Sequence, residues 1–114
     1  TDLSSAINYA FQTLKSPVLR AEYLYWLLFK KNVFEEGKTI KNPQLMMEMF
    51  EWREKISDAA SAEDKKQLIQ SIEDIIVDVQ KSFEQSLQKR DAVTGMEYAI
   101  RLNYYHKMLE ELDH

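Results

Sequence analysis

The sequence predicts an all-α protein, and three observations lead to this class. The 114 residues include only two Gly and two Pro, so few positions favour turns and the elements must be long. Residues that lose little side-chain freedom in a helix, such as Leu, Met, Glu, Lys and Ala, are plentiful. Apolar residues recur every three or four positions along most of the chain, which places them on one face of a helix.

Two helices are expected in the first 29 residues. The segment from Leu3 to Leu14 carries apolar residues at helical spacing. Ser16 then suits an N-cap and Pro17 the first helical position, so a second helix should begin there and run to about Phe29. Residues 30–41 are mostly polar and contain Gly, and we expect them to form a linker.

Three further helices are expected in residues 42–113. Asn42-Pro43 repeats the cap-and-proline signal, Ser61 with an acid three residues later resembles a capping box, and Asp91 suits the cap of a last helix. The long middle helix carries a near-heptad stripe of Leu68, Ile72, Ile75, Val79, Phe83 and Leu87. Short connections and matching stripes predict a C-terminal antiparallel three-helix bundle.

Two of these helices carry more apolar residues than one packed face requires. On the third helix the extra residues are Met46, Met47 and Phe50, with the charged residues Glu51, Arg53 and Glu54 around them. On the last helix a second stripe comprises Met96, Ile100, Tyr104 and Met108. A wide apolar arc is usually core, because a bundle helix contacts two neighbours. The alternative is an exposed, adaptable protein-binding patch, and spacing alone leaves both open.

Composition and motifs exclude several functions. A net charge of −4 argues against nucleic-acid binding, and no apolar run reaches the roughly 18–20 residues of a membrane span. The chain has no Cys, and the Glu-x-x-His spacing of di-iron bundles occurs only once, at Glu111 and His114. No phosphate-binding loop or nucleophile motif is present. We therefore expect no enzymatic activity, cofactor or metal site.

Two segments resemble the HscB-type J-protein co-chaperones of iron–sulfur cluster assembly. Residues 8–17 (NYAFQTLKSP) and 20–23 (RAEY) are similar to the end of a J domain, Asn-x-Ala-Tyr/Phe-x-Thr-Leu-x-x-Pro followed by Arg-Ala-x-Tyr. Ordinary J domains follow that Tyr with Asp, whereas here Leu24 follows and the helix continues, as in the HscB type. Residues 46–54 (MMEMFEWRE) are similar to that family's Leu-Met-Glu-x-x-Glu-x-Arg-Glu segment.

The resemblance implies both a domain organisation and a function. Residues 1–29 would be the last helices of a truncated J domain, and residues 42–113 would bind an IscU-type iron–sulfur scaffold protein. The whole protein would present this scaffold to a heat-shock ATPase chaperone through the J domain. The implied scaffold-contact positions are Met46, Phe50 and Tyr104, surrounded by Met47, Glu51, Arg53 and Glu54.

The resemblance also leads to three expectations about the chain as a whole. The sequence begins at Thr1 without the His-Pro-Asp loop that stimulates the chaperone ATPase, so we expect a fragment without that activity. The location would be the bacterial cytoplasm or, alternatively, the mitochondrial matrix. The face carrying Ile7, Phe11 and Leu14 would lack its usual cover, so residues 3–14 should favour self-association. The alternative function is a generic helical interaction module or a self-associating coiled coil.

Overall fold

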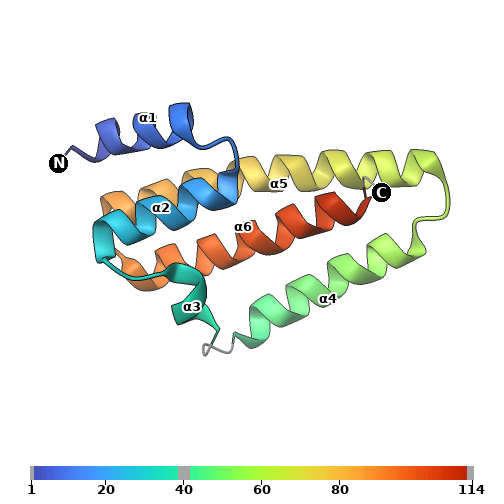
Figure 1. The fold of residues 1–114 in the computed structure, drawn as a ribbon. Coiled ribbons are helices and arrows are strands. Elements are labelled where there is room, and N and C mark those ends of the chain that lie inside the picture. The colour runs from blue at the N-terminus through green and yellow to red at the C-terminus, as the bar shows by residue number, and fades with distance from the viewer. Residues whose placement is uncertain (1, 39–41, 113–114) are drawn as a thin grey trace.

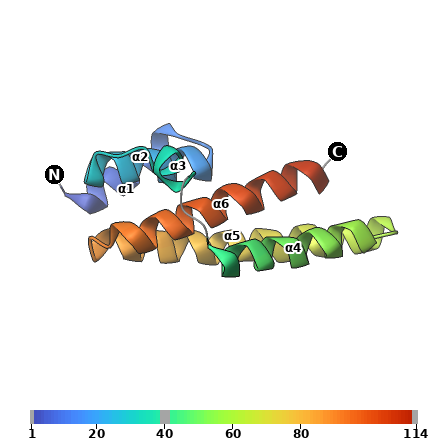
Figure 2. The same ribbon diagram turned by 90° about the horizontal axis from the view of Figure 1, so that it is seen from below.

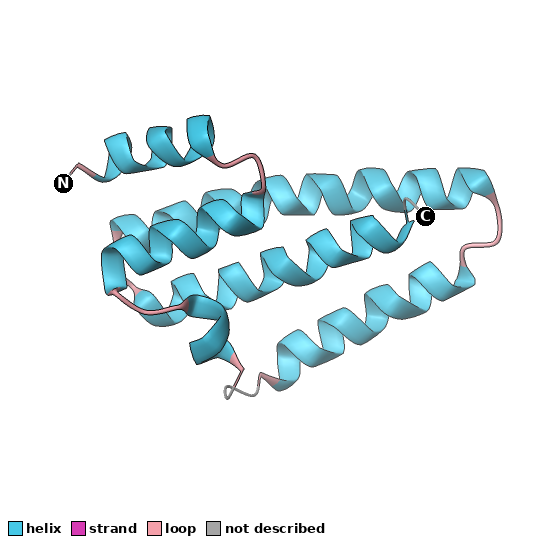
Figure 3. Ribbon diagram, in the orientation of Figure 1, coloured by secondary structure: helices cyan, strands magenta, loops and turns pink. Residues whose placement is uncertain are grey.

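The computed structural model describes residues 2–38 and 42–112, and within them the chain forms α-helices and no strand (Figures 1 and 3). The helices are α1 (Leu3–Thr13), α2 (Pro17–Phe29), α3 (Val33–Gly37), α4 (Pro43–Asp58), α5 (Ala62–Gln88) and α6 (Ala92–Leu112). The all-α class is confirmed. None of the helices in this part of the chain is long and apolar enough to cross a lipid bilayer.

The starts of four helices follow directly from the sequence. The predicted N-cap side chains each accept a backbone N–H from the first turn: Ser16 from Leu19, Asn42 from Leu45, Ser61 from Asp64 and Asp91 from Thr94. Each cap typically contributes about 1 kcal/mol to helix stability. The hydroxyl of Thr94 also donates to Asp91, and these bonds lower the pKa of the Asp91 carboxyl.

The antiparallel pair α5 and α6 forms the centre of the molecule and makes the most extensive helix–helix contact (Figure 1). Its buried side chains include Ile72, Val79, Phe83, Leu87, Ala99, Leu102, Tyr105 and Met108. The two helices approach closely at Gly95, where an added Cβ would lie 3.0 Å from the buried Ser86 hydroxyl. Only Gly allows this approach without a shift of Ser86.

Helix α2 packs on this pair and belongs to the same core. Ala21, Leu24 and Tyr25 are buried, and the Tyr25 hydroxyl donates to the Ala92 carbonyl at 3.0 Å. Figure 2 shows α1, α2 and α3 together along one side of α6, over the half of that helix that begins at Ala92. Helices α2 and α3 are therefore packed directly onto the C-terminal helices, and α1 packs on α2.

The linker expected at residues 30–41 contains a helix that the sequence did not predict. Helix α3 is one short turn whose N-cap, Asn32, accepts the N–H groups of Phe34 and Glu35. Val33 is fully buried, and α3 packs on α6. Val33 and Phe34 are adjacent in an otherwise polar stretch of α3, and two neighbouring apolar residues give no helical periodicity, which explains why α3 was missed.

Helix α1 is covered more than expected. Ala6 and Ala10 are buried, and Ile7 and Leu14 are half-buried rather than bare. Phe11 remains half-exposed, with the Arg20 guanidinium 4.2 Å from the centre of its ring. The expectation of an uncovered face is thus wrong for Ile7 and Leu14, because α1 folds back onto α2. Self-association through residues 3–14 stays a prediction.

Candidate protein-binding surface on α4 and α6

Three large apolar side chains of α4 face solvent. Met46, Met47 and Phe50 are 62%, 60% and 60% exposed. On the same helix Leu45 and Met49 are buried, so α4 has one apolar face against the molecule and another open to partners. For α4, the interpretation of the whole apolar arc as core is therefore wrong.

The second stripe of α6 behaves differently. Met96 and Met108 are buried, whereas Ile100 and Tyr104 are half-buried. An exposed patch along this whole stripe is therefore ruled out. Part of the reason is α3: Gly37 lies against Ile100 so closely that an added Cβ would lie 2.6 Å from the Ile100 Cδ1. Periodicity could not reveal this neighbour because α3 itself was not predicted.

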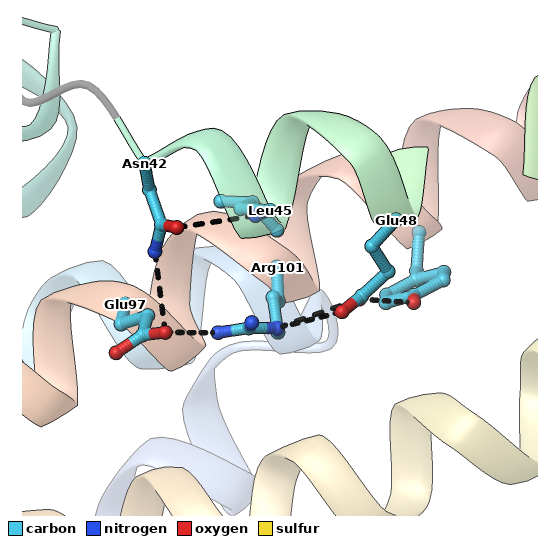
Figure 4. Close-up of polar contacts among 6 residues, drawn as sticks. Asn42, Leu45, Glu48, Glu97 and Arg101 are labelled. Carbon is cyan, nitrogen blue, oxygen red and sulfur yellow. Dashed lines mark hydrogen bonds and ion pairs between the residues drawn. The ribbon is translucent and has the colours of Figure 1, made fainter. Parts of the chain in front are cut away.

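A polar network fixes α4 on α6 (Figure 4). Arg101 of α6 pairs with Glu97 at 2.8 Å and with Glu48 of α4 at 3.4 Å. Glu48 also accepts a hydrogen bond from the Tyr105 hydroxyl, and Glu97 accepts one from the side-chain amide of Asn42 at 3.3 Å. Because the α4–α6 contact is the least extensive among the principal helix pairs, these bonds matter for the position of α4.

The ionisation of the network follows from its partial burial. Burial, followed by the hydrogen bond to Glu48 and its negative charge, raises the pKa of Tyr105. Burial alone would lower the pKa of Arg101, but hydrogen bonds and charges from Glu97 and Glu48 outweigh it and raise that pKa. Tyr105 is thus a neutral donor and Arg101 a cation at neutral pH. Trp52 of α4 completes the contact, with its ring edge-on to Tyr105 at 6.0 Å between centroids.

The charged residues predicted around the patch have two different environments. Arg53 forms an ion pair with Glu111 near the end of α6, a second tie between the two helices. Glu51 and Glu54 are exposed on α4. The apolar residues Met46, Met47 and Phe50 therefore have an acidic rim along the same helix.

A groove lies where α3 ends, α4 begins and α6 passes. Its volume is about 680 Å³, and it is lined by Gly37, Lys38, Asn42, Pro43, Leu45, Met46, Val93, Met96, Glu97, Ile100 and Tyr104. The structure thus brings Met46 and Tyr104 to one concave surface. Phe50 lies one helical turn beyond Met46 on α4 and is not among the lining residues. We refer to Met46, Met47, Phe50 and Tyr104 as the α4/α6 patch.

Sequence reasoning missed the residues that hold this surface in place. Glu48, Glu97 and Arg101 were not singled out from the sequence, although Glu97 and Arg101 have the four-residue spacing of a helical ion pair. Asn42 was recognised only as a cap. Its second role, the bond from α4 to Glu97, depends on a residue 55 positions away and has no local signal.

The described residues offer no metal site. Within residues 2–38 and 42–112, no group of three or more His, Asp or Glu side chains is placed so that it could hold a metal ion. His106 lies 3.9 Å from Glu110, its neighbour one turn away. The Glu-x-x-His pair at the C-terminus involves His114, which lies outside the described residues.

Comparisons with known proteins give a consistent result. Residues 41–113 match a family model described as the HSCB C-terminal oligomerisation domain. Three of the chain's relatives are called co-chaperone protein HscB homolog. The one from Photobacterium profundum is 32% identical, and the alignment covers 95% of this chain and 68% of the relative. The ones from Haemophilus influenzae and Psychromonas ingrahamii are 26% and 36% identical; the alignments cover 96% and 94% of this chain, and 65% and 54% of the relatives. The chain spans about two thirds or less of the length of these relatives. No solved structure matches it significantly.

Proposed function

Because the chain belongs to the HscB co-chaperone family, we propose that it contains the scaffold-binding part of a co-chaperone for iron–sulfur cluster assembly. Its partner would be an IscU-type scaffold protein, and the α4/α6 patch would be the binding surface. Members of this family are co-chaperones and not enzymes, so the proposed role is binding and presentation of the scaffold.

The observation that supports this proposal most strongly is the exposure of Met46, Met47 and Phe50 on one helix. Monomeric proteins rarely leave large apolar side chains clustered on an open surface unless a partner covers them. Met side chains adapt to the shape of a partner, and a central aromatic ring often supplies much of the binding energy. The exposed acids Glu51 and Glu54 would provide a polar rim.

The support beneath the patch is also suited to binding. Arg101 and Tyr105 tie α4 to α6 through Glu48, and Arg53 adds a tie through Glu111. A surface whose elements are already fixed loses less conformational entropy on binding than a mobile one. We therefore propose that the residues of the network position the patch and do not themselves provide most of the binding energy.

The rest of the family function is proposed for the longer protein. Presentation to a heat-shock ATPase chaperone would depend on a His-Pro-Asp loop, which is absent from residues 1–114. We propose that these residues alone bind the scaffold without stimulating the ATPase. The relatives are bacterial proteins, which favours the bacterial cytoplasm over the mitochondrial matrix as the location.

A pull-down with a purified IscU-type scaffold protein tests the proposal. The chain should retain the scaffold, and a Met46→Asp/Phe50→Asp double variant should not. Val77→Asp is the control, because Val77 is an exposed apolar residue of α5 outside the patch. Equal retention by all three proteins would refute the patch as the binding site, and no retention by any would refute scaffold binding.

Self-association is the second candidate function, because the description of the matching family domain names oligomerisation. In this case the α4/α6 patch or residues 3–14 would contact another copy of the chain. Sedimentation of the chain alone over a range of concentrations separates this from scaffold binding. A stable dimer that is lost in the double variant would favour self-association through the patch.

A further inference from the structure

We propose that the groove beside Met46 and Tyr104 is a second subsite for the same scaffold partner and receives an extended apolar segment of it. This subsite rests on the proposed function. It adds the groove to the α4/α6 patch as a further part of the binding surface, and it names an apolar segment of the scaffold as the occupant. Its centre is the first half of α6, where Val93, Met96 and Ile100 lie on one helical face with Tyr104.

The lining of the groove is mainly apolar and partly open. Val93, in the first turn of α6, is 78% exposed, and Ile100 is half-buried. Met96 is buried and lies at the base of the same face. An apolar side chain placed here would remove Val93 and Ile100 from water, which favours binding in proportion to the area covered.

The charges in the groove identify the chemical character of the occupant. Lys38 and Glu97 are the charged lining residues, and each already has a partner in the described structure. Lys38 pairs with Glu35 at 3.1 Å, and Glu97 pairs with Arg101 at 2.8 Å. Neither charge is left unpaired for an opposite charge of the partner, and most of the other lining residues are apolar. The groove therefore favours an uncharged, apolar segment.

Size and continuity identify a segment of the scaffold partner. A volume of about 680 Å³ lies in the range of sites that enclose a ligand of many atoms, so it suits several consecutive side chains better than one. Met46 and Tyr104 line the groove and also belong to the α4/α6 patch. A partner seated on the patch is thus adjacent to the groove and can extend a strand of chain into it.

The walls of the groove are fixed before any partner arrives. Gly37 of α3 lies directly against Ile100, and the Asn42 amide donates to Glu97 at the start of α4. Residues of α3, α4 and α6 therefore meet at the groove, and contacts within the chain hold them there. A preformed site of this kind loses little conformational entropy when a segment of the partner enters it.

Titration calorimetry with an IscU-type scaffold protein tests the inference with Val93→Asp. Val93 is exposed and lies in the first helical turn, where a carboxylate is favourable, so the variant should fold normally. We expect the dissociation constant to rise about tenfold, the equivalent of one central contact. Val77→Asp adds the same charge to an exposed apolar site on α5 and should leave affinity unchanged. Methyl NMR should also show the Ile100 signal shifting when the scaffold is added.

The outcomes separate this inference from the proposed function. If Phe50→Ala weakens binding while Val93→Asp binds normally and the Ile100 methyl does not move, the groove is not a subsite and the patch stands. If neither variant affects binding, the patch and the groove both fail. If Val93→Asp instead abolishes a dimer and leaves scaffold binding intact, the occupant is a second copy of the chain and the inference is overturned.

Discussion

At the scale of single residues, the exposure of each side chain of α4 indicates whether that side chain serves binding or stability. Phe50 and Met49 are neighbours in sequence, but Phe50 faces solvent and Met49 is buried. Truncation of a buried side chain leaves a cavity, whereas truncation of an exposed one removes only the contacts that a partner would make. The two effects can therefore be measured separately.

Phe50→Ala should weaken binding of the scaffold by about 1–3 kcal/mol, as expected for a central aromatic contact. The free energy of unfolding should change by less than about 0.5 kcal/mol, because the ring is exposed and leaves no cavity. Calorimetric titration gives the first quantity and urea unfolding the second. A Phe50→Ala protein that unfolds readily but binds normally while folded would contradict the assignment.

Ile72→Ala is the matched control inside the core. Ile72 is fully buried in α5, and its truncation should cost roughly 2–4 kcal/mol of stability by opening a cavity. Its affinity for the scaffold, measured where the protein is still folded, should remain close to that of the unmodified chain. A large loss of affinity in the folded Ile72→Ala protein would mean that binding depends on the core as a whole.

Arg101→Met tests the network that holds α4. The Arg101 side chain is only 16% exposed and pairs with Glu48 and Glu97, so its loss should cost about 1–2 kcal/mol of stability, allowing for the partial exposure of both acids. Arg53→Met is the matched control, since the Arg53–Glu111 pair is about half-exposed at both ends and should contribute less than about 1 kcal/mol. Equal losses in urea unfolding would contradict a special role for Arg101.

At the scale of elements, the helices that the sequence predicted are those with a cap and a long apolar stripe. Ser16, Asn42, Ser61 and Asp91 act through hydrogen bonds to the next few residues, so their signals are local and visible in the sequence. Helix α3 has a cap in Asn32 but no stripe, and it was missed.

The candidate site was only partly predictable, for a related reason. That Met46 and Phe50 lie outside the main apolar arc of α4 followed from helical geometry, a property of one helix. Their exposure did not follow from spacing, and only the resemblance to the HscB type favoured it. The burial of Met96 and Met108 and the ties from Arg101 to Glu48 depend on which helices become neighbours. Periodicity shows that a residue leaves the main face of its helix, but it does not show what covers that residue.

Helix α4 should detach before the α5–α6 pair unfolds. It meets α6 through side chains in the least extensive of the principal helix contacts, and regions with few buried contacts open at lower free energy. Trp52 of α4 packs on Tyr105 and reports this event by fluorescence once Trp26→Phe has removed the other Trp. We expect the Trp52 transition at lower urea than the loss of helical circular dichroism. Coincident transitions would indicate a single cooperative unit.

At the scale of the whole molecule, α1 is the segment most suited to contact between copies. Tyr9 and Phe11 remain about half-exposed, although Ala6 and Ala10 are buried within the chain. We predict weak self-association through residues 3–14, visible as a concentration-dependent sedimentation coefficient. Tyr9→Ser/Phe11→Ser should abolish it without affecting scaffold binding. A chain that is monomeric at all concentrations would show that the packing of α1 on α2 satisfies its apolar face.

The central claim is that an IscU-type scaffold protein binds to the α4/α6 patch and covers it. Amide hydrogen exchange of the chain, measured with and without the scaffold protein, tests this claim most directly. Exchange should slow in residues 43–54 of α4 and around Tyr104, and it should be unchanged around Val77 on the exposed face of α5. Binding accompanied by slower exchange in α1 or α5, with none in α4, would contradict the account.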